Sequence, residues 1–335
     1  MVGGYSLTLA YICFMMLIVL FPLLREEEKK NMYSFYETVF FFAMGIISAA
    51  FCAKWFASYH NIAKYIRVDS YLTIVRRCGF YGDPNFYVAH ITAALAGCLA
   101  LISQRRRLGN SIALAVLAIM LMYCGLLSGS KSFVLITALI IILWLVDLLQ
   151  IRGQLGKKLV VTVCGGIAIV FFARSAVIKN LVDVLVTRFS MATDMDGFTT
   201  GRTELWAIYF NKLLSDLKVL LVGEGFTSVT VNNGRSSHNT LLQMFYQFGI
   251  LGAPLILAWV SYYFGTVFKQ KHSRQNMLRK IVLLVGIFLP WMALDMLFFD
   301  EFFLMQWFCI LGFQDIGAES AVNRVVENDQ AVEML

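Results

Sequence analysis

Long apolar stretches separated by short polar stretches dominate this chain. Most of them approach the roughly 20 residues that an α-helix needs to cross the hydrocarbon core of a bilayer. The runs expected to form membrane helices are 5–24, 35–57, 84–103, 110–128, 132–150, 157–173, 240–268 and 280–298, with a shorter ninth run at 302–317. The pattern predicts an all-α polytopic membrane protein with about nine transmembrane helices, forming a single membrane domain over residues 1–335.

One polar connection, residues 174–239, is much longer than the others. Loops of such length inside a compact protein are usually functional or disordered, and the content of this one argues against disorder. In "RTELWAIYFNKLLSDL", four apolar residues recur at helical spacing, namely Leu205, Trp206, Tyr209 and Leu213. We therefore expect an amphipathic helix at about 202–217, lying at the membrane surface.

Composition excludes an ordinary soluble domain, because 59% of the 335 residues are hydrophobic and only 15% are charged. The net charge of +7 would indicate nucleic-acid binding in a soluble protein. Here the basic residues collect in short loops at 103–110, 151–158 and 268–280, which indicates the cytoplasmic side of a membrane. The expected partner is thus the lipid bilayer and not nucleic acid, and the loop 174–239 is expected to be external.

Metal chemistry finds no support in the sequence. The seven cysteines are scattered, without a CxxC pair, and no histidine cluster has the spacing of metal ligands. We therefore expect neither a metal nor another cofactor.

The stretch "TTGRTELW" at 199–206 places a cation where helix physics disfavours one. Thr200 or Gly201 can cap the helix that follows, so that Arg202 falls in its first turn, beside amides that already carry partial positive charge. That placement suits an anion site, since amides and guanidinium together bind phosphate. The alternative is that Arg202 pairs with an acid of a solvated loop, namely Asp194, Asp196 or Glu204.

The stretch "SSHNTLL" introduces the helix expected at 240–268. Ser236 or Ser237 is the expected N-cap, which places His238 at the outer mouth of the helix. The positive end of the helix dipole favours a neutral imidazole, able to accept a proton from a sugar hydroxyl. Asn239 adds an amide that can orient either partner. The alternative is an interfacial histidine that only hydrogen-bonds loop carbonyls.

Two further outward segments carry cations. In "RRCGFYGDPNFY" at 76–87, Asp83 and Pro84 have the positions of an N-cap and a first helical residue and are interpreted as structural. Arg76 and Arg77 can bind an anion or only meet lipid headgroups. Lys131, in "LLSGSKSFVL", can do the same or extend its amine to the interface.

Together these outward segments offer several cations and one base, which indicates a phosphorylated lipid as the substrate. The residues expected to be catalytic are His238 and Arg202. Those expected to contact the substrate are Lys131, Arg77, Arg76, Asn239, Asn85 and Glu204.

One pattern resembles a known family. His238-Asn239, nine residues and then Gly249-Ile-Leu-Gly252 resemble the HN-x9-GxxG pattern of O-antigen ligases and Wzy-type polysaccharide polymerases. The segments that resemble other parts of the family, in the same order, are "GDPNFY" at 82–87, "SGSKS" at 128–132, "TGRTELW" at 200–206 and "LLVGEGF" at 220–226.

The resemblance implies a GT-C-type membrane fold and glycan transfer from an undecaprenyl-diphosphate donor on the outer side of a bacterial inner membrane. It implies that Arg202 binds the donor diphosphate and that His238 activates the acceptor hydroxyl. Lys131 matches a position where relatives often have arginine. Lysine keeps the charge there but loses the two parallel hydrogen bonds of a guanidinium.

We therefore expect a metal-independent, inverting glycosyltransferase that polymerises lipid-linked repeat units into a capsule, exopolysaccharide or O-antigen. A flippase and a chain-length regulator are the protein partners that such an enzyme would have. The alternative is a ligase that transfers the glycan to lipid A core or another acceptor. A transporter of the same lipids is disfavoured, because the candidate residues lie at helix mouths and not near the bilayer midplane.

The charge distribution generates a topology prediction. Single cysteines at Gln154 and Gln275 should be shielded from a membrane-impermeant thiol reagent in intact cells, whereas a cysteine at Asn232 should react. The measurement is labelling in a background without native cysteines. Labelling of the first two positions but not the third would refute the topology and the external site with it.

Overall fold

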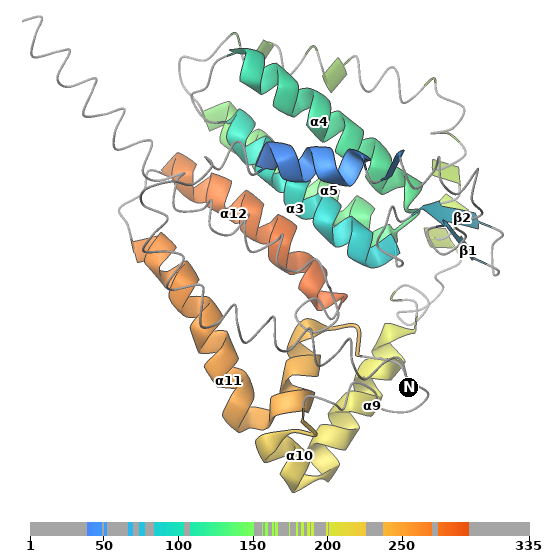
Figure 1. Cartoon of the computed structure of the whole chain (residues 1–335), viewed down its shortest axis with the longest axis vertical. Helices are drawn as coiled ribbons and strands as arrows, with labels where there is room; N and C mark the ends of the chain where they lie inside the picture. Colours follow the sequence, from blue (N-terminus) through green and yellow to red (C-terminus); the bar gives the residue numbers. More distant parts are fainter. Residues whose placement is uncertain are drawn as a thin grey trace, which may run out of the picture.

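The computed structural model is mostly helical (Figure 1). It describes residues 39–51 apart from 49, 66–69, 74–77, 84–103, 108–150, 201–225, 237–269 and 274–294, together with single positions between 156 and 199.

Four helices and one short apolar helix form the central bundle (Figure 1). Their bounds are α3 Pro84–Ile102, α4 Leu108–Leu127, α5 Lys131–Gln150, α12 Arg274–Phe288 and Val39–Ser48. Helix α3 is the centre, because every residue except Asn85 and Phe86 is buried. Its many alanines let neighbours approach closely, as small residues do in membrane proteins.

The contact between α3 and α12 shows how close this approach is. A Cβ atom at Gly286 of α12 would collide with Ala96 and with the carbonyl of Thr92. The Thr92 hydroxyl donates to the Gly286 carbonyl at 3.1 Å, in addition to the Ala89 carbonyl at 2.9 Å. Small side chains and one hydrogen bond therefore join the two helices where hydrophobic contrast with lipid is weak.

Four described helices are long and apolar enough to cross a membrane, namely Pro84–Ile102, Gly109–Leu127, Lys131–Gln150 and Thr240–Ala258. The first three confirm the helices predicted at 84–103, 110–128 and 132–150. The predicted runs 5–24 and 302–317, and most of 35–57 and 157–173, lie outside the described residues. The number of nine spans therefore stays a prediction.

The helix predicted at 280–298 lies further towards the N-terminus than expected. Helix α12 begins at Arg274 and ends at Phe288, where a 3-10 turn, η2 Leu289–Met292, takes over. Pro290 lies in that turn, and a proline has no N–H to continue an α-helical ladder.

The polar start of α12 also changes the interpretation of the basic loop predicted at 268–280. Arg279 and Lys280 are buried, and the Arg279 Nε lies 3.3 Å from a carboxylate oxygen of Asp147 on α5. These two cations belong to the helix packing and not to a solvated loop. The other ends of the basic connections, at Ser103, Leu108 and Gln150, belong to the same end of the bundle because the intervening loops are short.

The all-α prediction needs one small correction. Two strands, β1 Ile66–Asp69 and β2 Ile74–Arg77, pair antiparallel, with Ile66 opposite Arg77 and Arg67 opposite Arg76. Both strands are rich in β-branched residues, which favour extended backbone. The hairpin matters because it carries Arg76.

The predicted amphipathic helix is present as two helices, α9 Arg202–Ser215 and α10 Leu217–Val222. Asp216 separates them, since its extended backbone ends α9 while its carboxylate accepts hydrogen bonds from the Lys218 and Val219 amides at 3.0 and 3.4 Å. Aspartate is a preferred N-cap for this reason. The cap explains why one predicted helix becomes two.

The predicted apolar face of α9 packs against another helix. Tyr209 and Leu213 are buried, and together with Val219 they pack against Leu242 and Tyr246 of α11 Thr240–Lys269. The Tyr209 and Tyr246 rings meet edge to face, with centroids 4.8 Å apart. This face is therefore covered by protein and not by the membrane surface.

Helix α11 is broken at Gly249, whose φ of 63° and ψ of −173° are not helical. Figure 1 shows a sharp turn, after which residues 250–269 run back towards the start of α12. At the break, the amides of Glu224 and Gly225 donate to the carbonyls of Tyr246 and Gln247 at 2.9 and 3.0 Å. The segment after α10 therefore satisfies carbonyls near the break, which the interrupted ladder would otherwise leave without amide donors.

The two glycines of the HN-x9-GxxG pattern behave differently. A Cβ atom at Gly249 would collide with the Leu221 carbonyl of α10, so this glycine permits the close packing of α10. At Gly252 the nearest atom to an added Cβ would be the Cβ of Phe248, 2.8 Å away and in the same helix, and no other described helix comes as close.

Gly249→Ala should lower the apparent unfolding temperature strongly. The observed backbone conformation is in practice available only to glycine and costs another residue about 1–3 kcal/mol, with a similar additional cost for the steric overlap. Gly109→Ala is the matched control, because no atom lies within 4 Å of its added Cβ. Differential scanning fluorimetry of the purified protein checks this, and equal unfolding temperatures for the two variants would contradict it.

Candidate functional site

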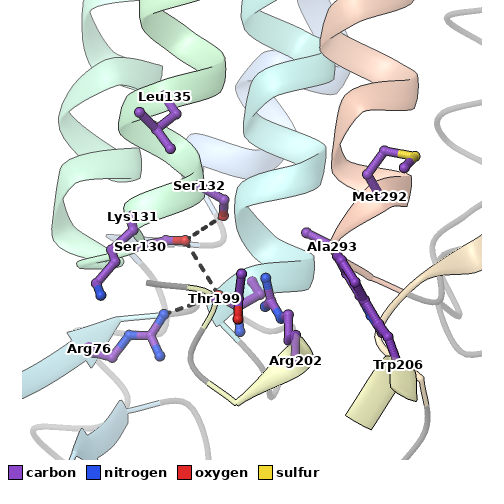
Figure 2. Close-up of a pocket in the computed structure, with 11 residues that line it drawn as sticks. Arg76, Ser130, Lys131, Ser132, Leu135, Thr199, Arg202, Trp206, Met292 and Ala293 are labelled. Carbon is purple, nitrogen blue, oxygen red and sulfur yellow. Dashed lines mark hydrogen bonds between the residues drawn. The ribbon is translucent and has the colours of Figure 1, made fainter. Parts of the chain in front are cut away.

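A cavity of about 190 Å³ opens at the end of the bundle opposite the Asp147–Arg279 ion pair (Figure 2). The residues that line it are Arg76, Asn85, Ser130, Lys131, Ser132, Leu135, Thr199, Arg202, Trp206, Met292 and Ala293. They come from the hairpin, from the start of α3, from the first turns of α5 and α9 with the residues just before them, and from the 3-10 turn that follows α12. Segments more than 200 residues apart in the sequence thus build one site.

The cavity is strongly cationic. Arg76, Lys131 and Arg202 line it, and the described lining contains neither aspartate nor glutamate. The N-termini of α3, α5 and α9 also converge there, at Pro84, Lys131 and Arg202. Each helix N-terminus carries partial positive charge, worth about 0.3–1 kcal/mol towards an anion at exposed sites. The lining therefore selects for a ligand with several negative charges.

A hydrogen-bond network fixes the orientation of the buried Arg76 side chain. Its Nε donates to the Ser128 carbonyl at 2.8 Å, and its Nη2 donates to the Asn85 Oδ1 at 3.2 Å (Figure 2). Ser130 donates to the same Asn85 oxygen at 3.4 Å and shares a 2.8 Å hydrogen bond with the Ser132 hydroxyl. These bonds hold the guanidinium in one orientation beside the cavity.

The turn "SGS" between α4 and α5 makes this network possible. Gly129 has a φ of 60°, and the Ser130 amide donates to the Ser128 hydroxyl at 3.2 Å. The left-handed glycine reverses the chain, so that the Ser128 carbonyl meets Arg76 while Lys131 begins α5.

Arg202 is the first residue of α9, as predicted, and Gly201 is the N-cap with a φ of 79°. Glycine offers no capping side chain, and Thr199 supplies one instead. Its hydroxyl accepts from the Thr203 amide at 3.4 Å and shares a 2.6 Å hydrogen bond with the Thr203 hydroxyl. Lys131 lies over the Phe189 ring, with its amine 5.7 Å from the ring centroid, within the range of a cation–π contact.

His238 lies in a tightly bonded turn just before α11. The N-cap of that helix is Asn239, because its Oδ1 accepts from the Leu242 amide at 3.1 Å and its carbonyl accepts from Gln243 at 2.9 Å. The expectation that Ser236 or Ser237 is the N-cap is therefore wrong: Asn239 reaches the amide three residues on, whereas Ser237 bonds the backbone of Asn239.

The backbone at His238 is left-handed, with a φ of 50°, which is uncommon for a residue with a side chain. Its neighbours hold it there. The Ser237 amide donates to the Gln243 side chain at 3.1 Å, and the Ser237 hydroxyl donates to the Asn239 carbonyl at 2.9 Å. Backbone conformations of this kind persist where the surroundings over-determine them, and they gather at functional sites.

Two hydrogen bonds connect the His238 turn to the cavity. The Trp206 Nε1 donates to the Ser237 carbonyl at 2.9 Å, and the Asn239 Nδ2 donates to the Met292 carbonyl at 3.3 Å. Trp206 and Met292 both line the cavity, whereas His238 does not. The partly exposed histidine is thus placed next to the cationic cavity by the residues on either side of it.

The structure brings four of the predicted site residues together at the cavity, namely Arg76, Asn85, Lys131 and Arg202. Glu204 is exposed on α9 and does not line it, and the amide of Asn239 serves as helix cap and as a tie to Met292. The side chain of Arg77 and the residues Asp194, Asp196, Thr200 and Ser236 lie outside the described residues.

Sequence reasoning missed Trp206, Thr199, Ser130, Ser132 and Met292 as site residues. The serines lie in the quoted "SGSKS" segment, where polar residues between two apolar runs are a usable signal. Trp206 was hidden because it fits the apolar face of α9. Met292 offered no signal, since the run 280–298 predicts a position inside a membrane helix.

Chemically, the site can hold a multiply charged anion and present it to an imidazole at its rim. Arg76, Lys131 and Arg202 supply positive charge, which can stabilise such an anion. Comparisons with protein-family models, curated proteins and solved structures give no match to this chain.

Trp206→Phe should loosen the His238 turn while preserving the fold. It removes the indole N–H that bonds Ser237 and keeps an aromatic ring. Losing a hydrogen bond worth about 0.5–1.5 kcal/mol should speed amide exchange at residues 237–240 about 2- to 13-fold. Hydrogen–deuterium exchange with mass spectrometry measures this.

The matched control is Trp144→Phe on α5. Trp144 is buried, whereas Trp206 is partly buried, and the Trp144 indole N–H has no hydrogen-bond partner among the described residues. Its substitution should leave exchange at residues 237–240 unchanged. Equal acceleration in both variants would show that the Trp206 bond does not hold the turn.

Proposed function

We propose that this protein is a membrane glycosyltransferase that extends a surface polysaccharide, with an undecaprenyl-diphosphate-linked oligosaccharide as donor and a second lipid-linked repeat unit as acceptor. The single observation that carries the proposal is the cavity with three cations, three helix N-termini and no acidic residue in its described lining. The resemblance of the HN-x9-GxxG pattern supports the glycan chemistry.

The charge of the donor fits this lining. A diphosphate esterified at both ends carries two negative charges, and a third develops when its bond to the sugar breaks. Arg76, Lys131 and Arg202 match that final charge. An interaction that strengthens as the charge develops stabilises the transition state more than the bound substrate, which is the requirement for catalysis.

His238 completes the reaction in this proposal. The acceptor hydroxyl oxygen attacks the anomeric carbon of the donor sugar, its proton passes to the imidazole, and the bond from that carbon to the diphosphate oxygen breaks. The new glycosidic bond has inverted configuration, because the attack comes from the side opposite the leaving group. No divalent ion enters the scheme, since side-chain cations meet the charge.

The size of the cavity limits what it holds. Pockets for drug-sized ligands have volumes of roughly 300–1,000 Å³. At about 190 Å³, this one accommodates the diphosphate with part of the adjoining sugar and leaves the polyprenyl chain and the remaining glycan outside. In the proposal, the chain has a GT-C-type fold with about nine spans in a bacterial inner membrane, and the cavity faces the periplasm or cell exterior.

His238→Ala should reduce polymer synthesis from purified lipid-linked donor by at least ~100-fold, because general-base catalysis contributes about that much or more. Arg202→Ala should cost about 100- to 1,000-fold. Arg202→Lys should also be poor, since one amine cannot replace the guanidinium fork. His238→Ala should still bind donor, whereas Arg202→Ala should bind it more weakly.

Lys218→Ala is the control, because Lys218 is an exposed cation of α10 that does not line the cavity. All assays are run in excess EDTA, where the wild type should stay active. Full synthesis by His238→Ala would show that the interfacial-histidine interpretation is correct. Loss of wild-type activity in EDTA, restored by magnesium, would contradict the metal-independent scheme.

A further inference from the structure

Helices α9 and α10 expose a second set of apolar side chains. They are Phe210, Leu214, Leu217, Leu221 and Val222, which we name the apolar ridge. Leu214 is 73% exposed and Leu217 is 69% exposed, values usual for polar surface residues. Phe210 and Leu214 are four residues apart on α9, and Leu217 and Leu221 are four residues apart on α10, so each pair lies on one face of its helix.

The ridge is not the face that packs these helices onto the protein. The packing face is formed by Tyr209, Leu213 and Val219. These side chains pack against Leu242 and Tyr246 of α11. Because the packing face is already covered, the exposed ridge is a separate surface. Large contiguous apolar patches on a protein surface mark a contact with a membrane or another protein.

The position of the ridge identifies the occupant as lipid. The backbone of Leu221 and Val222 touches Gly249, at the break of α11. Directly after that break, Ile250, Leu251 and Leu255 are exposed on the apolar half of α11 that runs towards the start of α12 (Figure 1). Leu255 is 71% exposed, about as much as Leu214 and Leu217, so the ridge continues the exposed apolar surface of α11, one of the described helices that are apolar enough to cross a membrane.

We propose that the apolar ridge inserts into the leaflet at the cavity end of the bundle, so that α9 and α10 form an interfacial anchor. Amphipathic helices of this kind bury their apolar face about 5–10 Å deep, at the boundary of headgroups and acyl chains. The exposed polar residues Glu204, Asn211 and Lys218 remain in the aqueous or headgroup layer.

The anchor has a consequence for the cavity. Arg202 begins the same helix that carries Phe210 and Leu214. Trp206 lies between Arg202 and Phe210 in the sequence. An α9 held at the interface places the cavity at headgroup depth, where the phosphates of a lipid lie. The insertion itself is independent of the proposed glycosyl transfer. The role of the anchor in bringing the cavity to a lipid phosphate rests on that proposed function.

Fluorescence quenching in nanodiscs tests the insertion. The full chain, with its seven native cysteines replaced by alanine, carries bimane on a single cysteine at Leu214, Leu217, Leu255 or Asn211. Brominated phosphatidylcholine should quench bimane at Leu214 and Leu217 about as strongly as at Leu255 and at least ~2-fold more than at Asn211. Iodide in the buffer should quench the Asn211 label most.

Two outcomes would overturn the proposal. Strong iodide quenching at Leu214 and Leu217, with bromolipid quenching no greater than at Asn211, would show that the ridge faces water. Shielding from both quenchers would show that protein covers it, either a second copy or another part of this chain.

A second measurement keeps the native cysteines and does not depend on the replaced background. The photo-crosslinking amino acid p-benzoylphenylalanine is introduced at Leu214 or Leu217, with Asn211 as control. Irradiation in phosphatidylcholine nanodiscs should give lipid adducts, detected by intact-mass spectrometry, at the two ridge positions. Protein–protein adducts alone, or adduct yields equal to those at Asn211, would refute insertion.

Discussion

The break of α11 at Gly249 is the constraint on which the cavity end of this structure depends. Only a residue without a side chain can adopt its backbone conformation and let the Leu221 carbonyl approach. The amides of Glu224 and Gly225 then bond the carbonyls of Tyr246 and Gln247. The "LLVGEGF" segment and the HN-x9-GxxG segment therefore contact each other at the break and stabilise it together.

The contact between α10 and the break determines where the residues of the candidate site lie. Because α10 is fixed at the break, α9 packs along the first half of α11 through Tyr209 and Tyr246. That packing brings Trp206 to the Ser237 carbonyl and the start of α9 to the cavity. The cationic side of the cavity and the histidine turn are thus connected through α9.

The two ends of the bundle differ in the surroundings of their cations. Near the basic loops, Arg279 pairs with Asp147, which offsets the cost of removing both from water. At the other end, Arg76, Lys131 and Arg202 line one cavity whose described lining contains neither aspartate nor glutamate. Like charges repel when they are held together, and an anionic ligand relieves that repulsion.

Hydrophobic runs alone determined the membrane class, three of the bundle helices and the amphipathic character of α9, because bilayer thickness and helical period are local rules. The sequence also indicated Arg76, Asn85, Lys131 and Arg202 as site residues. Tertiary structure decided the rest. The role of Trp206, the cap at Asn239 and the apposition of Gly249 with Leu221 depend on contacts between distant segments, which a local pattern does not encode.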